Sequence, residues 1–108
     1  MTLAPTSIPT AWNVLHQAIT QRRAVRATYH NRIRVISPHA LGWKNGRPKA
    51  LVYQTAVLGP PPSQDPRGWR SLFVEEIQNP IITDDKWRTA DNYTPRTTGI
   101  DTIAAAIT

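Results

Sequence analysis

The chain has 108 residues and a formal net charge of +6 at neutral pH, and ten prolines divide it into short segments. At this length we expect one domain, because a second independently packed core does not fit. The absence of cysteine excludes disulfides, thiolate nucleophiles and cysteine-ligated zinc, and we expect a cytoplasmic protein. No apolar run approaches the ~20 residues that span a bilayer, and residues 1–9 lack the features of a signal peptide, so no membrane partner is expected.

Positive charge is concentrated in the first part of the chain. Residues 1–64 contain eight Lys and Arg side chains and no acid, whereas residues 65–108 contain five such cations and seven acids. The two parts therefore carry +8 and −2. This asymmetry predicts one face that attracts phosphate, and the alternative is a solvated basic surface without a ligand.

One helix is expected near the start of the chain. Residues 1–9 are rich in Thr, Ser and Pro, which predicts a flexible N-terminal arm. Large apolar side chains then recur at spacings of three and four, which predicts a helix over residues 11–23 that Thr10 caps. Arg22 and Arg23 would lie in its last turn, where cations suit the helix dipole.

Short strands follow the helix, and the expected segments are residues 24–30, 32–37, 41–43, 50–58, 69–77 and 80–83. Pro38 should end the second strand because it has no amide proton to donate, and Pro80 should confine the last strand to an edge. Asn45-Gly46 predicts a hairpin between the third and fourth strands. Residues 59–68, with three successive prolines, predict a loop whose length indicates a functional rim.

The predicted fold is mainly β, of the α+β class, with one N-terminal helix and a small antiparallel β-barrel. Closure is expected because it removes the exposed edges of a sheet of this size. The barrel domain would span residues 10–93, with Trp87 and Tyr93 anchoring its polar last stretch. Residues 94–108 form a C-terminal tail that is expected to hold a short helix or to remain disordered.

Four short motifs follow the expected helix. They are Tyr29 at a strand end, Arg34-Val35-Ile36-Ser37-Pro38 with Leu41 after it, Ala50-Leu51-Val52-Tyr53-Gln54, and a last strand from Arg70 to Ile77 that closes on an acidic residue. In this order they resemble the WYL domain family, over roughly Trp12 to Ile82. The sequence departs from the family where Lys49-Ala50-Leu51 stands in place of Trp-Tyr-Leu. It also has Glu76 where a basic residue is usual.

The resemblance implies an Sm-like small barrel that senses or binds a ligand, either single-stranded nucleic acid or a nucleotide. In many family members such a barrel follows a winged-helix DNA-binding domain and regulates transcription. This chain shows no such domain, so we expect it to act alone, as a homo-oligomer or with a regulatory protein partner.

The same resemblance implies five ligand-binding residues, namely Tyr29, Arg34, His39, Gln54 and Arg70. Arginine presents a planar fork of donors that fits a phosphate, and an aromatic ring gives a base a surface for stacking. An auxiliary basic surface would comprise Arg26, Arg32 and Arg47.

Each of these residues also has a structural interpretation. The two arginines could be surface cations or ion-pair partners of nearby glutamates, and Tyr29 could be a core residue with its hydroxyl at the edge. His39, which we expect in a loop between strands, could bind a phosphate or fix the turn. Trp43 and Trp69 could stack on bases, but large aromatic residues in a small barrel more often belong to the core.

No sequence motif predicts catalysis. The three histidines lack metal-binding spacing, and no glycine-flanked serine is present. Glu75 and Glu76 are neighbours in an expected strand and would point to opposite faces. We therefore expect no enzyme, no metal and no cofactor. The first hypothesis is a regulatory module whose nucleic-acid binding weakens steeply with salt, and the alternative is a protein-interaction or oligomerisation module that pairs through an edge strand.

Overall fold

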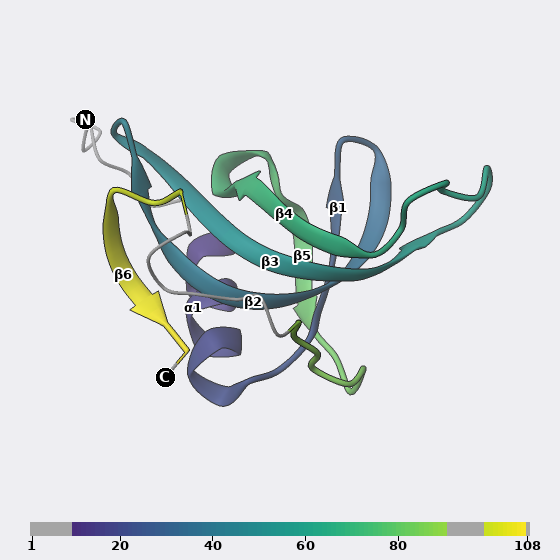
Figure 1. Ribbon diagram of the computed structural model, residues 1–108, viewed down its shortest axis with the longest axis horizontal. Coiled ribbons are helices and arrows are strands. Elements are labelled where there is room, and N and C mark those ends of the chain that lie inside the picture. Colours follow the sequence, from purple (N-terminus) through teal and green to yellow (C-terminus); the bar gives the residue numbers. More distant parts are fainter. Residues whose placement is uncertain (1–9, 91–98, 108) are drawn as a thin grey trace.

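One helix and six strands make up the described part of the chain, which is residues 10–90 and 99–107 of a computed structural model (Figure 1). The elements are α1 (Thr10–Gln21), β1 (Val25–Tyr29), β2 (Arg32–Lys44), β3 (Arg47–Leu58), β4 (Gly68–Phe73), the 3-10 turn η1 (Val74–Glu76), β5 (Gln78–Ile82) and β6 (Thr102–Ala106). The expected mainly β fold with one helix is confirmed. The predicted N-terminal arm and Tyr93 lie outside the described residues.

The strands form one antiparallel sheet in the order β4-β3-β2-β1-β5, and β6 pairs with β2 off this path. The long hairpin of β2 and β3 is strongly bent across the molecule (Figure 1). No ladder among the described residues joins β4 to β5, so the sheet is not closed and the predicted barrel is not confirmed. The edge position expected for the strand with Pro80 is confirmed, because β5 is the last strand in this order.

Strand β2 does not end at Pro38, so that prediction is wrong. Along one edge of β2, the ladder with β1 stops at Ile36 and the ladder with β6 begins at Ala40. On the other edge the register with β3 shifts between Pro38 and Ala40, which leaves His39 as an extra residue on β2. A proline is tolerated at such an interruption because fewer ladder hydrogen bonds require its missing amide proton.

Of two further predictions about strand ends, one is confirmed and one is wrong. The hairpin at Asn45-Gly46 is confirmed, with φ angles of 50° and 78° that fit a two-residue type I′ turn. The strand expected over residues 69–77 instead ends at Phe73, where a 3-10 turn begins. That turn buries Val74, whose carbonyl oxygen accepts a hydrogen bond from the Ile77 amide.

The C-terminal tail was expected to be a short helix or disordered, and this is wrong for residues 102–106, which form β6. This strand pairs with Ala40–Trp43 of β2, with a register shift between Leu41 and Gly42. The alternation in its sequence is weak, because three of its five residues are alanine. Its backbone pairing with the edge of β2 beyond the β1 ladder supplies what the local pattern lacks.

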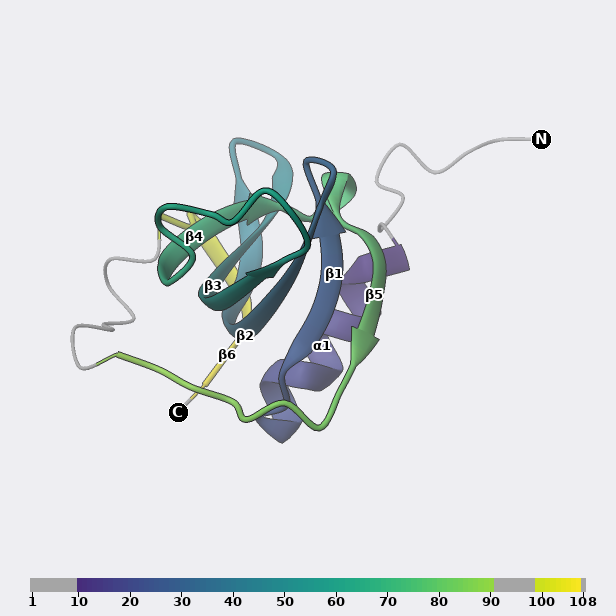
Figure 2. The same ribbon diagram turned by 90° about the vertical axis from the view of Figure 1, so that its right-hand side faces the viewer.

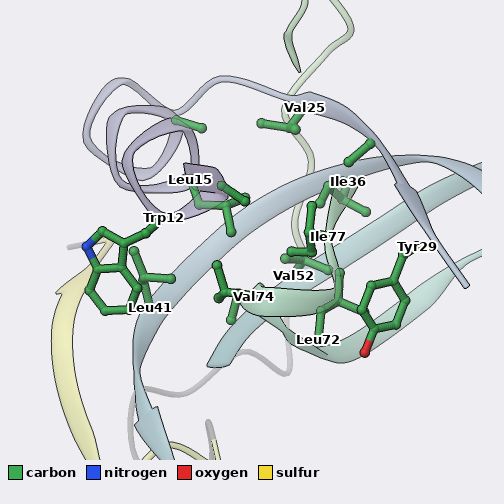
Figure 3. Packing of buried hydrophobic residues seen from close by; sticks show 14 of the residues in the cluster. Trp12, Leu15, Val25, Tyr29, Ile36, Leu41, Val52, Leu72, Val74 and Ile77 are labelled. Atoms are coloured by element: carbon green, nitrogen blue, oxygen red, sulfur yellow. The ribbon is translucent and has the colours of Figure 1, made fainter. Parts of the chain in front are cut away.

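Helix α1 packs against the sheet beside β5 and carries the apolar stripe that the sequence predicted (Figure 2). Leu15 is completely buried and points into a core shared with β1, β2, β3 and η1 (Figure 3). The helix ends at Gln21 because Arg22 takes a left-handed conformation with φ of 51°. The placement of Arg22 and Arg23 in the last helical turn is therefore wrong. The described helix is too short and too polar to cross a membrane.

Gly42 allows β6 to approach β2 closely. A Cβ atom at this position would overlap the carbonyl oxygen of Thr102 and lie 2.6 Å from the Ile100 side chain. We expect Gly42→Ala to lower the free energy of unfolding by about 1–3 kcal/mol, because β6 must move away. Urea denaturation measures this loss, with Ser71→Ala at an exposed position of β4 as the control. Equal free energies for the two variants would contradict the close packing of β6.

Candidate anion-binding site

Much of the positive charge in the first part of the chain is paired with carboxylates of the second part. The pairs are Arg23 with Asp84 at 3.1 Å, Arg26 with Asp85 at 2.8 Å, Lys44 with Asp101 at 3.2 Å, and Arg47 with both Glu75 and Glu76. Hydrogen bonds from Arg26 and Thr83 lower the pKa of Asp85 to about 2. The charge asymmetry of the sequence therefore largely reflects ion pairing within the fold.

Three arginines stand apart from these pairs, and we call Arg32, Arg34 and Arg70 the arginine cluster. Among the described residues, all their hydrogen bonds go to backbone carbonyls or to the Gln54 amide, and none goes to a carboxylate. Within residues 10–90 and 99–107, the one ion-pair contact of the cluster is that of Asp65, 3.6 Å from Arg70. Burial lowers the pKa of Arg34, and the charges of Arg70 and Arg32 lower it further. Arg34 is thus within electrostatic range of both other arginines.

Arg34 contacts two of the other residues that the family resemblance implied. Its Nε donates to the carbonyl oxygen of Tyr29 at 3.1 Å, and its Nη1 donates to Oε1 of Gln54 at 3.0 Å. Its guanidinium carbon lies 5.6 Å from the centroid of the Tyr29 ring. Gln54 is almost fully buried at a register shift between β2 and β3, where Thr55 is the extra residue. The structure therefore brings Tyr29, Arg34 and Gln54 together, and the charge of Arg70 acts on Arg34.

Tyr29 has a clear structural role in this arrangement. Its ring belongs to the core, and its hydroxyl oxygen accepts a hydrogen bond from the Phe73 amide at 3.2 Å. The ring also stacks on that of His30, with the centroids 4.0 Å apart. His30 was not among the predicted site residues; it follows Tyr29 in the turn between β1 and β2, at the end of the strand expected over residues 24–30. Its side chain is 62% exposed and its Nε2 lies 2.6 Å from Glu76 Oε1.

His39 does not lie in a loop, so that prediction is wrong. It is completely buried in β2, stacked on Trp87 and edge-on to Trp69. Its Nδ1 donates to the Ser37 carbonyl oxygen at 2.7 Å, because a carbonyl can only accept. Its Nε2 therefore accepts from the Thr89 hydroxyl at 2.7 Å. Burial lowers the pKa of His39 to about 4, so the ring is neutral at pH 7.

The other aromatic and basic candidates have contacts that fit structural roles. Trp43 packs on Trp12, with the ring centroids 5.1 Å apart, at the edge of the core. Trp87 anchors the stretch after β5, because its Nε1 donates to the Pro38 carbonyl oxygen. Arg47 lies 3.7 Å above the Phe73 ring while it pairs with two glutamates. Arg26 and Arg47 therefore do not join Arg32, which is the one auxiliary residue within the cluster.

A shallow groove of about 350 Å³ lies elsewhere, where β1, β2 and β5 lie side by side. Its lining comprises Arg26, Ala27, Thr28, Ile33, Leu58, Asn79 and Ile81. Ile33 is 49% exposed and Ile81 is 62% exposed, which is unusual for large apolar side chains. The groove is mainly apolar and shares no residue with the arginine cluster.

Residues 10–90 and 99–107 contain no group of three His, Asp or Glu side chains that could hold a metal ion. Comparisons with protein-family models, with curated proteins and with solved structures found no match. The interpretation of the site therefore depends on its own geometry.

The burial of His39 predicts a pH-dependent stability. The unfolded chain binds a proton at its ordinary pKa of 6.5, whereas the folded chain binds it at about 4. The contribution of His39 to the free energy of unfolding is therefore fully present above pH 6.5. It is lost as the pH drops toward 4, by about 3 kcal/mol in all.

Urea denaturation at pH values from about 7.5 to about 4.5 spans most of this window and should reveal the loss of stability. His39→Gln should make the free energy of unfolding depend less on pH. His16→Gln, at an exposed helix position, is the matched control and should keep the slope of the unchanged protein. An identical slope in His39→Gln and the unchanged protein would contradict the assignment.

Proposed function

We propose that this chain is a binding module for an anionic ligand, single-stranded nucleic acid or a nucleotide, which it binds at the arginine cluster. The observation that carries the proposal is that Arg34 lies within electrostatic range of both Arg32 and Arg70, and that none of the three donates a hydrogen bond to a carboxylate among the described residues. Three close like charges repel, and a phosphate bound among them would turn that repulsion into attraction. The guanidinium groups supply the paired donors that phosphate oxygens accept.

The stacked rings of Tyr29 and His30 support a ligand that also carries a base. Tyr29 is only 7% exposed, so the outer ring of the pair, His30, is the surface available for stacking. A base on an aromatic ring contributes to binding whatever its identity, which suits single-stranded nucleic acid. The neighbouring Arg34 would hold the phosphate of the same nucleotide.

The contacts of Tyr29, Arg34 and Gln54 also support the resemblance to the WYL family, since that resemblance selected all three. The helix before an antiparallel sheet is consistent with it. The proposal includes an Sm-like barrel, a regulatory role, a cytoplasmic location and the absence of catalysis. Each of these is expected from the sequence.

A second candidate function is protein interaction through the groove beside β5. The exposed side chains of Ile33 and Ile81 favour it, because contiguous exposed apolar residues are characteristic of interfaces. In that case the partner would be another copy of the chain or a regulatory protein, and the arginine cluster would have no ligand.

Fluorescence anisotropy of labelled oligo(dT) and oligo(rU) tests the first proposal. We expect binding that weakens steeply with salt, and the double variant Arg34→Ala/Arg70→Ala should weaken it by about 10- to 100-fold, because two charged hydrogen-bond donors are lost.

The matched control is Arg26→Ala/Arg47→Ala, which removes the same net charge from residues that are paired with carboxylates. It should weaken binding far less, and circular dichroism checks that both variants fold. Equal losses of affinity in the two double variants would contradict the proposal, because net charge alone would then explain the binding. Absence of binding, together with an oligomer that Ile81→Glu dissociates, would favour the second candidate.

A further inference from the structure

The loop of residues 59–67, between β3 and β4, is attached at its start to the arginine cluster. Nη2 of Arg32 donates hydrogen bonds to the carbonyl oxygens of Gly59 at 3.0 Å and Pro61 at 2.6 Å. The loop lies at the end of the molecule opposite β6 (Figure 1), and its first residues are exposed. Arg32 therefore binds a segment that has little packing of its own.

The end of the same loop is attached to two other residues of the site. Nη2 of Arg70 donates to the carbonyl oxygen of Asp65 at 2.7 Å, and Nε2 of Gln54 donates to that of Pro66 at 2.9 Å. The carboxylate of Asp65 lies 3.6 Å from the same Nη2 of Arg70 and is 83% exposed. One acidic side chain of the loop thus reaches the cluster.

We propose that this loop is a lid that occupies the arginine cluster until an anionic ligand displaces it. The inference rests on the function proposed above and concerns the regulation of the same site. The loop carbonyls accept from Arg32 and Arg70, the guanidinium groups that would bind a phosphate. A phosphate carries full negative charge, so it replaces neutral carbonyl acceptors with stronger ones.

The backbone at both ends of the loop suits a hinged segment. Gly59 has φ of 82° and Gly68 has φ of 140°, conformations that glycine adopts without strain. Hinges are often such element-terminal positions, and they absorb the change in φ and ψ when a loop opens. Most loop residues are exposed, so opening the loop costs little apolar burial.

Asp65 is the competitor that a ligand must replace, and its removal tests this directly. Asp65→Asn should bind oligo(dT) about two- to fivefold more tightly, in proportion to the small strength of an exposed ion pair. Asp84→Asn is the matched control, because it removes the same charge from an exposed aspartate that pairs with Arg23 outside the site. Equal gains in the two variants would overturn the proposal, since net charge alone would then explain them.

Trypsin cleavage after Arg67 measures loop opening without reference to affinity. In the ligand-free protein, Arg32→Ala should speed this cleavage, while Arg26→Ala, which removes an arginine paired with Asp85, should not. Saturation of the unchanged protein with oligo(dT) should speed it as well.

The outcomes separate the lid from the proposed function. Binding that depends on Arg34 and Arg70, with cleavage after Arg67 slowed or unchanged by oligo(dT), would overturn the lid and leave the binding function standing. Absence of binding in every variant would refute the proposed function and the regulation with it.

Discussion

The backbone hydrogen-bonding groups of β2 are shared among three antiparallel ladders, with β3 along one edge and β1 and β6 in succession along the other. Between those last two ladders, residues 37–39 pair with neither strand. Donors from later in the chain bind there instead, including Trp87 to Pro38 and the Ile107 amide to His39. The buried histidine and the position of the C-terminal strand therefore follow from how this one strand satisfies its polar groups. The same strand carries Arg32 and Arg34 at its other end.

The cations of the chain fall into two groups according to their hydrogen-bond partners. Carboxylates from the second part of the chain neutralise cations such as Arg26 and Arg47, whose side chains are about half exposed. Exposed pairs of this kind contribute little stability, about 0–1 kcal/mol each, but they remove those cations from the surface available to a ligand. The arginine cluster has backbone carbonyls in place of carboxylates. That difference in partners, more than the net charge of the chain, distinguishes the candidate site.

Local patterns predicted the helix, the first strand and the hairpin at Asn45-Gly46, because each depends on neighbouring residues. Periodicity did not predict β6 or the continuation through Pro38, since both depend on pairing between distant segments. The meeting of Arg34 with Gln54 depends on the extra residue Thr55 in β3, which no local signal announces. The resemblance to a known family selected both residues, but it also selected His39, whose ring nitrogens bond to Ser37 and Thr89.

The central claim is that the arginines without a hydrogen-bonded carboxylate, and not the paired ones, receive the anion. Nuclear magnetic resonance of the arginine Nε–H groups during titration with adenosine monophosphate tests it most directly. We expect saturable shifts of Arg34 and Arg70, and of Arg32 as the lid opens, with Arg26 and Arg47 unchanged. Shifts spread equally over all five arginines, or confined to the paired ones, would contradict it.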